Sequence, residues 1–266
     1  MFTVVIPLYN KELSIKNTIQ SVLNQTYQEF EIVVINDGST DNSTRIVEAI
    51  NDNRIKLTHQ ENQGVSTARN RGIKMANNEW IAFLDGDDLW KVNHLEEITK
   101  MMQKFPNQKV YVTSFEYSDK RPMFRHSRTE SVFEVESYFK EAIKERLMWT
   151  SIVVVHKSCI NKVGDFNERL NRGEDLDLWA RLVREYTAIK SAKVTAVYNM
   201  DGADLSLGKS IYIKSVLSII DLKGLKGYER KYYKRMLINR LKYDIKTLDL
   251  SEILILIFKH NFQLII

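Results

Sequence analysis

Three carboxylates stand within four residues of this sequence, at Asp85, Asp87 and Asp88, directly after the apolar run Trp80–Phe83. Oxygen ligands of this kind suit Mg²⁺ or Mn²⁺. In open α/β sheets, ligands bind just outside the carboxyl ends of the strands. The same residues also fit a solvated acidic turn in which Gly86 takes a positive φ. The rest of the sequence must decide between these interpretations.

Three further polar clusters lie where a nucleotide site is expected. Tyr9 follows the first apolar run and could stack on a base or cap the core. Asp37 could accept a hydrogen bond from a base or a ribose, whereas Asp41 is better placed to cap the next helix. Arg69 could contact a base or a phosphate, or be a surface arginine on a helix.

A fifth cluster lies far along the chain, where Glu174 and Asp175 precede the apolar positions Leu178, Trp179 and Leu182. The helix dipole alone favours acidic residues in a first helical turn. A carboxylate near a bound substrate could also act as a general base toward a hydroxyl. Both interpretations stay open from the residues alone.

Glycine-rich phosphate loops are missing from the expected positions. No glycine occurs between Leu8 and Leu13, so the G-x-G-x-x-G turn of dinucleotide oxidoreductases is absent there. No Walker-type G-x-x-x-x-G-K-[ST] sequence occurs either. A metal held by carboxylates is then the remaining way to neutralise a diphosphate, and this favours a functional acidic cluster.

Strands and helices alternate in the first part of the chain. The expected strands are Thr3–Leu8, Glu31–Ile35, Ile55–Thr58 and Trp80–Leu84. Helices are expected around Ile15, Ile19, Val22 and Leu23, after the capping residues 39–42, and over Ser66–Ala76. This alternation predicts an α/β fold with a mostly parallel central sheet flanked by helices.

The pattern changes after residue 109. Further strands are expected at Val110–Tyr117, Ile152–Val155 and Ala192–Tyr198, and helices at Val132–Leu147 and Gly173–Glu185. Mixed strand pairing is therefore expected in this half. After Asp201 the sequence is typical of a helical extension, with breaks near Gly224 and Gly227.

Composition places the chain among ordinary globular proteins. Hydrophobic residues make up 44% and charged residues 27% of its 266 positions. Cys159 is the single cysteine, which excludes a disulfide framework and favours a reducing compartment. No secretory signal is recognisable, and no apolar run approaches the ~20 residues that span a bilayer. We therefore expect a cytoplasmic protein that is soluble or lies on a membrane surface.

The C-terminal segment is basic and amphipathic. Residues 223–246 hold nine Lys or Arg and only two acidic residues. One helical face would carry Leu237, Ile238, Leu241, Ile245 and Leu248. Such a helix could lie on the anionic inner face of the cell membrane, or pack on the preceding domain with a solvated basic face. Nucleic acid is not an expected partner, because no recognition motif is present.

The motifs in this order resemble the family 2 glycosyltransferases, which have the GT-A fold. The matching segments are Val5-Ile6-Pro7-Leu8-Tyr9-Asn10, Ser21-Val22-Leu23-Asn24-Gln25-Thr26, Ile35-Asn36-Asp37-Gly38-Ser39-Thr40-Asp41, Ala68-Arg69-Asn70-x-Gly72, Phe83-Leu84-Asp85-Gly86-Asp87-Asp88, Val163-Gly164-x-Phe166-Asn167-Glu168 and Gly173-Glu174-Asp175-x-Asp177-Leu178-Trp179. No single segment is decisive, but the ordered set is highly specific.

The resemblance implies a role for each matched position. The nucleotide-sugar contacts would be Pro7, Tyr9, Asn10, Asp37, Arg69, Asp85, Gly86 and Asp87. Asp85 and Asp87 match the D-x-D pair that holds Mn²⁺ or Mg²⁺, with Asp87 the direct ligand. Asp175 matches the base that deprotonates the acceptor hydroxyl, with inversion at the anomeric carbon.

Two departures from the family pattern matter. Nothing beyond the acid pair fits the Q-x-x-R-W sequence of processive members, so one sugar is expected per encounter. The chain reads Tyr198-Asn199-Met200-Asp201 where many members place a histidine, so a third protein ligand to the metal is in doubt. Trp149, Thr150 and Glu174 are the candidate acceptor contacts, although Trp149 also suits core packing.

These observations lead to one functional prediction. Residues 1–109 would form the donor half and 110–200 the acceptor half of one domain, and 201–266 the helical extension. The chain would move one sugar from a nucleotide sugar, expected to be a UDP-sugar, to a glycan or lipid-linked acceptor in surface polysaccharide or glycolipid synthesis. The alternatives are a non-catalytic sugar-nucleotide-binding or membrane-docked scaffold, and a nucleotidyltransferase, which would need an early glycine- and lysine-bearing phosphate loop.

Overall fold

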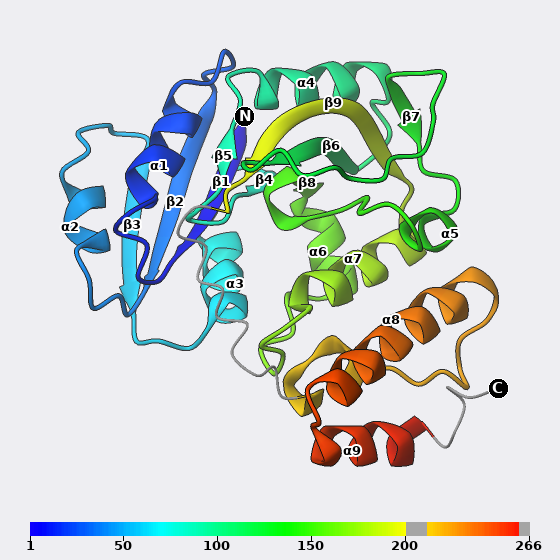
Figure 1. The fold of residues 1–266 in the computed structure, drawn as a ribbon. Helices are drawn as coiled ribbons and strands as arrows, with labels where there is room; N and C mark the ends of the chain where they lie inside the picture. The colour runs from blue at the N-terminus through cyan, green and yellow to red at the C-terminus, as the bar shows by residue number, and fades with distance from the viewer. Residues whose placement is uncertain (201–211, 261–266) are drawn as a thin grey trace.

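The structure is a computed structural model that describes residues 1–200 and 212–260 (Figure 1). The first half of the chain contains β1 (Phe2–Leu8), α1 (Ile15–Leu23), β2 (Phe30–Asp37), α2 (Ser43–Glu48), β3 (Ile55–Gln60), α3 (Val65–Met75), β4 (Trp80–Phe83), β5 (Leu89–Trp90) and α4 (His94–Lys104). The expected alternation of strands and helices is therefore confirmed in this half.

The second half mixes short strands and helices. Its elements are β6 (Val110–Tyr117), β7 (Val132–Glu134), α5 (Tyr138–Ala142), the 3₁₀ turn η1 (Thr150–Ile152), β8 (Val153–His156), α6 (Lys157–Val163), α7 (Glu174–Glu185), β9 (Ala188–Tyr198), the 3₁₀ turns η2 (Tyr212–Lys214) and η3 (Val216–Ser218), α8 (Gly227–Lys246) and α9 (Leu250–His260). Segments 201–211 and 261–266 of the predicted extension lie outside the described residues.

Within the described residues, nine strands form one sheet in the order β3-β2-β1-β4-β8-β6-β9-β5, with β7 also paired to β9. β1 runs parallel to β2 and β4, and β2 runs parallel to β3. β8 is antiparallel to both β4 and β6, whereas β6 and β9 are parallel. The mixed pairing expected after residue 109 is confirmed, and the sheet continues across that position.

The central strands are covered on both faces, as their unbroken apolar sequences predict. Every residue of β2 is buried. In Figure 1, α3, α6 and α7 lie on one side of the sheet and α4 lies on the other. A Cβ atom added at Gly72 of α3 would lie 2.3 Å from Cγ1 of Val5 in β1. Only glycine permits this close approach, which brings α3 and its Arg69 against the sheet.

Two expectations for the second half were wrong. Val132–Leu147 is not a helix, because Val132–Glu134 pairs with β9 as a strand and only Tyr138–Ala142 is α-helical. Strand pairing overrides the helical periodicity of the segment. Helix α6 of this half, and α4 of the first half, were not predicted from the sequence. The final strand begins at Ala188 rather than Ala192.

The C-terminal extension packs on the preceding domain through a second apolar cluster. Leu237 of α8 is fully buried there, and Ile238 and Leu241 pack partly against the same cluster. The expected amphipathic stripe is thus covered over most of its length, in agreement with the packed alternative. Ile245 and Leu248, at the end of the stripe, are exposed. No helix within residues 1–200 and 212–260 is long and apolar enough to cross a membrane.

Candidate active site

The acidic cluster follows β4, and two of its three carboxylates are paired with cations. Asp85 accepts a hydrogen bond from Nη2 of Arg69 at 2.5 Å. Asp87 lies 2.8 Å from Nζ of Lys11, on the loop that leaves β1. Both carboxylates are about one-fifth exposed, at 23% and 22% of their side-chain surface. They therefore face the open end of the sheet rather than the core.

Asp88 is the buried member of the cluster. Its carboxylate accepts hydrogen bonds from Oγ of Ser151 at 2.6 Å and from the backbone N–H of Asn199 at 3.2 Å. Burial raises the pKa of Asp88 well above its ordinary value, and the charges of Asp85 and Asp87 add to that effect. The carboxylates of Asp85, Asp87 and Asp88 therefore concentrate negative charge in this loop.

Gly86 lies in a close contact and does not adopt a positive φ. The structure gives it no left-handed backbone conformation, so the turn expected from φ alone is wrong. A Cβ atom at Gly86 would lie 3.0 Å from the carbonyl oxygen of Pro7. The carbonyl oxygen of Gly86 also accepts hydrogen bonds from Ser14 and Thr18 of the first helical segment. The acidic loop is thereby held against the end of β1.

Arg69 is buried, so its interpretation as a surface arginine was wrong. Only 3% of the residue is exposed, and its guanidinium joins Asp85 to Glu174 at 2.5 and 2.8 Å. Burial alone would lower the pKa of Arg69, but the two carboxylates raise it above its ordinary value. Its Nε has no hydrogen-bond partner among the described residues. Arg69 thus links the acidic cluster to the acid pair of α7.

Tyr9 and Asn10 lie on the rim of the same end of the sheet. Tyr9 is 46% exposed, so it does not cap the core. Asn10 has a φ of 49°, a left-handed conformation that asparagine tolerates better than most residues. Oδ1 of Asn10 accepts a hydrogen bond from the backbone N–H of Thr40 at 2.8 Å. This bond ties the loop after β1 to the loop after β2, and leaves the ring of Tyr9 open to solvent.

Asp37 is buried at the end of β2 and organises the neighbouring loop. Its carboxylate accepts hydrogen bonds from Nε2 of Gln60 at 2.7 Å and from the backbone N–H groups of Gln63 and Gly64 at 2.9 Å. These three bonds hold the loop between β3 and α3. A contact between Asp37 and a nucleotide stays a prediction.

The two acidic residues at the start of α7 have different environments. Glu174 is 9% exposed and pairs with Arg69. Asp175 is half-buried, and it lines a cavity together with Arg146 and Arg172. Burial raises the pKa of Asp175 to about 6, and the negative charge of Glu174 adds to the rise. A carboxyl with this pKa can accept a proton near neutral pH, as a general base must.

Trp149 and Thr150 lie in the interior rather than on a cleft surface. They are 3% and 2% exposed. The indole of Trp149 stacks on Tyr198 with ring centroids 4.9 Å apart and contacts Phe115 at 4.6 Å. Core packing, the alternative weighed for Trp149, is what the structure shows. Contact of either residue with an acceptor remains a prediction.

The chemistry of the acidic cluster fits a divalent cation. Mg²⁺ and Mn²⁺ are commonly held by one or two carboxylates, with substrate phosphates completing the coordination. Asp85 and Asp87 supply such oxygens, and a cation beside them would offset the crowding that raises the pKa of Asp88. Within the described residues, no group of three His, Cys, Asp or Glu side chains is arranged as a complete protein site.

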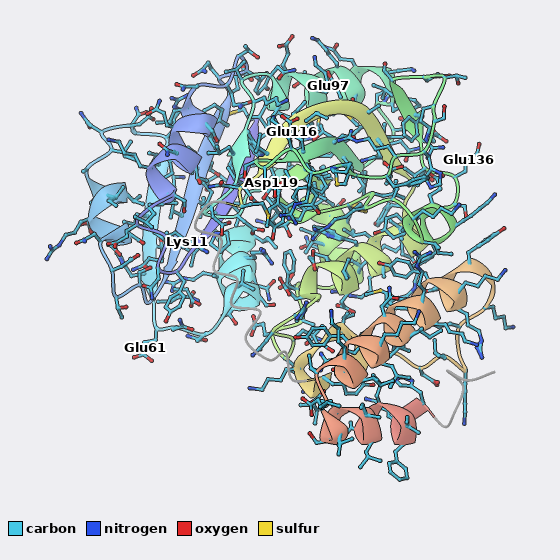
Figure 2. All side chains as sticks on the ribbon, in the orientation of Figure 1. Lys11, Glu61, Glu97, Glu116, Asp119 and Glu136 are labelled. Atoms are coloured by element: carbon cyan, nitrogen blue, oxygen red, sulfur yellow. The ribbon has the colours of Figure 1, made fainter. Side chains whose placement is uncertain are left out.

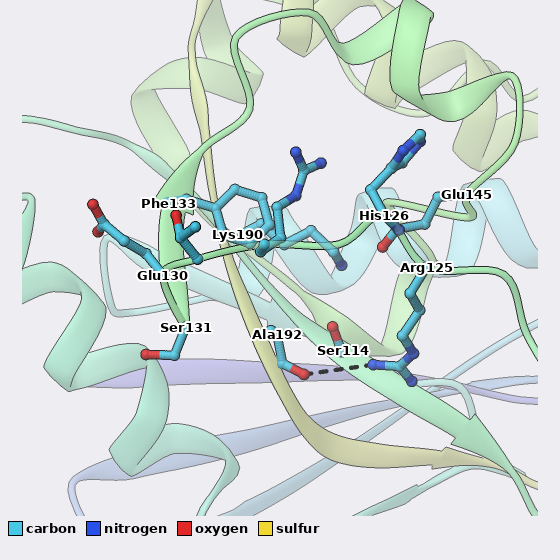
Figure 3. A pocket seen from close by; sticks show the side chains of 11 residues that line it. Ser114, Arg125, His126, Glu130, Ser131, Phe133, Glu145, Lys190 and Ala192 are labelled. Atoms are coloured by element: carbon cyan, nitrogen blue, oxygen red, sulfur yellow. Dashed lines mark hydrogen bonds between the residues drawn. The ribbon is translucent and has the colours of Figure 1, made fainter.

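A second cavity, of about 330 Å³, lies beside β7 and β9, away from the acid pair (Figure 3). Its cationic side chains are already engaged. Arg125 donates to the carbonyl oxygens of Phe115 and Ala192, and Lys190 donates to those of Thr113 and Leu147. Burial lowers the pKa of Lys190 to about 8. These bonds brace β9 against its neighbours, so the cavity is a weaker candidate for the functional site.

Sequence reasoning missed two parts of the site. Lys11 was not considered, although it directly follows the Tyr9-Asn10 pair in the sequence. The contact between Ser151 and Asp88 joins residues 63 positions apart. No local pattern could have shown that contact. The lysine was visible as a cation at the end of the first strand.

The α/β sheet, with acidic and basic side chains gathered at its strand ends, defines a GT-A-type transferase fold. The profile of the glycosyl transferase family 2 matches residues 3–170. The chain therefore belongs to family 2 of the glycosyltransferases, as its ordered motifs predicted. It is a member of an enzyme family.

Three relatives illustrate the similarity. The glucosyltransferase WfgD of Escherichia coli, named as UDP-Glc:alpha-D-GlcNAc-diphosphoundecaprenol beta-1,3-glucosyltransferase, is 29% identical over 92% of this chain and 94% of its own length. TarS of S. aureus in complex with UDP-GlcNAc has a TM-score of 0.65 at 19% identity, covering 91% of this chain and 80% of that structure. The mannosyltransferase PcManGT from Pyrobaculum calidifontis, in complex with GDP-Man and Mn²⁺, has a TM-score of 0.60 at 18% identity, covering 78% of this chain and 59% of that one.

Other curated relatives are longer than this chain. It spans 25%, 50% and 31% of the length of three glycosyltransferases to which it is 35%, 35% and 30% identical. The aligned part of each therefore corresponds to one portion of a larger protein.

Proposed function

We propose that the chain transfers one sugar, with inversion, from a nucleotide sugar to an acceptor hydroxyl, and that the donor is a UDP-sugar. The observation that carries this proposal is the chain of contacts Asp85–Arg69–Glu174, which ends beside the half-buried carboxylate of Asp175. These contacts support the proposal, because they link the acidic loop that would hold a cation to the acid pair that would supply the proton acceptor. TarS, which has the same fold, has been crystallised with UDP-GlcNAc.

In this mechanism Asp175 accepts the proton of the acceptor hydroxyl while the oxygen attacks the anomeric carbon. The bond between that carbon and the diphosphate breaks as the new bond forms, so the configuration inverts. A divalent cation, when bound, supplies positive charge to the departing diphosphate. Asp85 and Asp87 would hold it, and Arg69 keeps Asp85 in place. Lys11 is positioned to add positive charge beside Asp87.

The acceptor is proposed to be a lipid-linked saccharide in surface polysaccharide or glycolipid synthesis. WfgD, which aligns over nearly its whole length with this chain, is named for transfer to GlcNAc-diphosphoundecaprenol. The cavity beside Asp175 lies outside the acidic cluster and is open to such an acceptor. Donor and acceptor would thus approach Asp175 from different sides.

A panel of nucleotide sugars, screened by thermal shift with Mn²⁺ present, tests the donor class. Binding to the folded state at a hundredfold excess over Kd stabilises it by about 2.7 kcal/mol. We expect the largest shift from a UDP-sugar, and release of UDP when that sugar is supplied with a lipid-linked acceptor. No shift with any member of the panel would contradict the proposed function.

Metal dependence is tested at Asp87. Asp87→Ala is expected to weaken binding of UDP in the presence of Mn²⁺ by about tenfold or more, because the ion loses a carboxylate ligand. Isothermal titration calorimetry with and without chelator measures the effect. Chelator should weaken binding by the native chain and leave the variant unchanged.

The matched control for this experiment is Glu136→Ala. Glu136 is an exposed carboxylate beside α5, well away from Lys11 at the donor end of the sheet (Figure 2). Its removal should leave UDP affinity and the effect of chelator as they are in the native chain. Equal UDP affinity with and without chelator, in the native chain and in Asp87→Ala alike, would remove the metal from the proposal.

Peripheral membrane binding is proposed for α9 rather than for the stripe of α8. Leu250, Leu254 and Phe258 of α9 are 69%, 54% and 75% exposed, and α9 contacts the Lys- and Arg-rich helix α8. An exposed apolar face beside basic side chains is typical of helices that lie on anionic lipid. Such binding would bring the site to a lipid-linked acceptor.

Replacing these three residues by serine tests this surface. Sedimentation with anionic liposomes should fall to the level seen with neutral liposomes, and added salt should weaken binding by the native chain. Val92→Ser is the control, since Val92 is 56% exposed on the loop between β5 and α4. Unchanged sedimentation of the triple variant would rule out docking through α9.

A further inference from the structure

A cavity of about 580 Å³ lies between the start of α7 and α8. Asp175 lines it from α7, and Arg146 and Arg172 line it from the preceding loops. Val216 and Met236 contribute apolar walls from η3 and α8. The cavity therefore combines the proposed base, two guanidinium groups and apolar surface. Figure 1 shows α7 and α8 next to one another.

The wall formed by η3 is built against the start of α7. Gly173 has a φ of 72°, and a Cβ atom there would lie 2.6 Å from Cγ1 of Val216. The backbone N–H of Val216 donates to the carbonyl oxygen of Arg172 at 2.9 Å, and that of Asn171 donates to Lys214 at 2.8 Å. These contacts fix the C-terminal extension beside the acid pair. The extension is thus a part of the cavity rather than an appended tail.

The arginines of the cavity differ in their partners. Arg240 of α8 is held by Asp244 and Glu252. Arg146 and Arg172 are exposed, and neither guanidinium forms an ion pair with any residue in the described ranges. Arg146 lies over the ring of Tyr198 at 5.8 Å, which limits its orientation. Two positive charges therefore border the cavity. Neither forms an ion pair with a carboxylate among the described residues, although Asp175 lines the same cavity.

The apolar surface continues along α8. A neighbouring cavity of about 320 Å³ shares Arg146, Leu176 and Met236 with the first one. Tyr232 and Arg235 of α8 extend its lining. The two cavities therefore adjoin at Arg146, Leu176 and Met236, so the lined surface that includes Asp175 extends beside further side chains of α8.

We propose that this cavity binds the phosphate-bearing part of an amphiphilic acceptor. The sugar hydroxyl would lie at Asp175, the phosphate or diphosphate at Arg146 and Arg172, and the apolar chain beside Met236. This assignment rests on the proposed function, because it takes Asp175 as the base. Guanidinium groups bind phosphate oxygens in pairs through their planar donors. A neutral glycan would leave both charges unused and would gain little from the apolar wall.

Binding of farnesyl diphosphate to the full-length chain tests the proposal, with chelator present to suppress diphosphate binding at the acidic cluster. Arg146→Gln and Arg172→Gln are each expected to weaken this binding by about tenfold or more, through loss of charge-assisted hydrogen bonds. Inorganic pyrophosphate and farnesol should both bind the native chain more weakly than farnesyl diphosphate. Lys242→Gln is the control, because Lys242 is an exposed cation of α8 that lines neither cavity.

UDP titrated into the same variants with Mn²⁺ separates this proposal from the proposed function. Its affinity should stay within twofold of the native value. Unchanged binding of farnesyl diphosphate by a chain that carries both Arg146→Gln and Arg172→Gln would overturn the phosphate site, and so would an equal loss in Lys242→Gln. If farnesol bound as tightly as farnesyl diphosphate, the cavity would not recognise the phosphate. If pyrophosphate bound as tightly as farnesyl diphosphate, the cavity would not recognise the apolar chain. A native chain that fails to bind UDP would instead contradict the donor assignment.

Discussion

Asp175→Asn is expected to lower kcat by about 10³-fold, within the range of 10² to 10⁴ that a general base contributes. The amide has nearly the shape of the carboxylate but cannot accept the proton of the acceptor hydroxyl. The affinity for UDP should stay within twofold, because the Arg69–Asp85 and Arg69–Glu174 contacts do not involve Asp175. Initial rates at saturating donor and acceptor, with calorimetry for UDP, measure both quantities.

The pH dependence of the native chain gives an independent check on Asp175. Its pKa is raised to about 6, and only the ionised form can act as a base. The rate should therefore fall as the pH drops through about 6, and this limb should disappear from the residual activity of Asp175→Asn. Asp177→Asn is the matched control on the same helical turn, since its carboxylate binds Arg181. An unchanged rate in Asp175→Asn would exclude the residue as the base.

Arg69→Met is expected to lower the free energy of unfolding by about 3–5 kcal/mol, because one partner of a buried ion pair is removed and the other charges stay behind. Glu174 would lose the partner that lies 2.8 Å away, and Asp85 the one at 2.5 Å. Urea unfolding measures the loss. The difference from the native chain should shrink at acidic pH, since protonation neutralises the stranded carboxylates.

A second variant separates charge from packing in this network. Arg69→Met combined with Glu174→Gln should recover part of the lost stability, because one unpaired buried charge is removed with its partner. Arg45→Met is the control, as Arg45 is exposed on α2 and forms no ion pair within the described residues. A loss below about 1 kcal/mol for Arg69→Met, typical of exposed ion pairs, would show that the buried network contributes little.

Arg69 also connects the parts of the chain that the sequence divides. It belongs to the first 109 residues, whereas Glu174 follows more than a hundred positions later. A buried cation shared by both parts keeps the acid pair of α7 at a set place beside the acidic loop. Under the proposed function, donor and acceptor contacts would then lie on different elements and still meet at one position.

Much of the first half of the sheet was predictable from sequence, because it depends on local patterns. Apolar runs such as Trp80–Phe83 predict buried strands, and polar residues that directly follow them must lie at the strand ends. Parallel strands place those ends on one edge of the sheet, so the strand pattern alone assigns Asp37 and Asp85 to one region. The ordered motifs then led to the family, which the matched profile over residues 3–170 confirms.

The sequence alone determines the family of this protein and its alternation of strands and helices. It also determines which side chains follow the ends of strands. Each of these features depends on residues within a few positions of one another. Contacts between distant segments needed the folded chain. The burial of Arg69, the covering of α8 and the strand pairing of Val132–Glu134 each depend on which surface another element brings close. The sequence of a single helix or strand carries no information about the surface that another element presents to it. Its periodicity alone therefore could not reveal these three contacts.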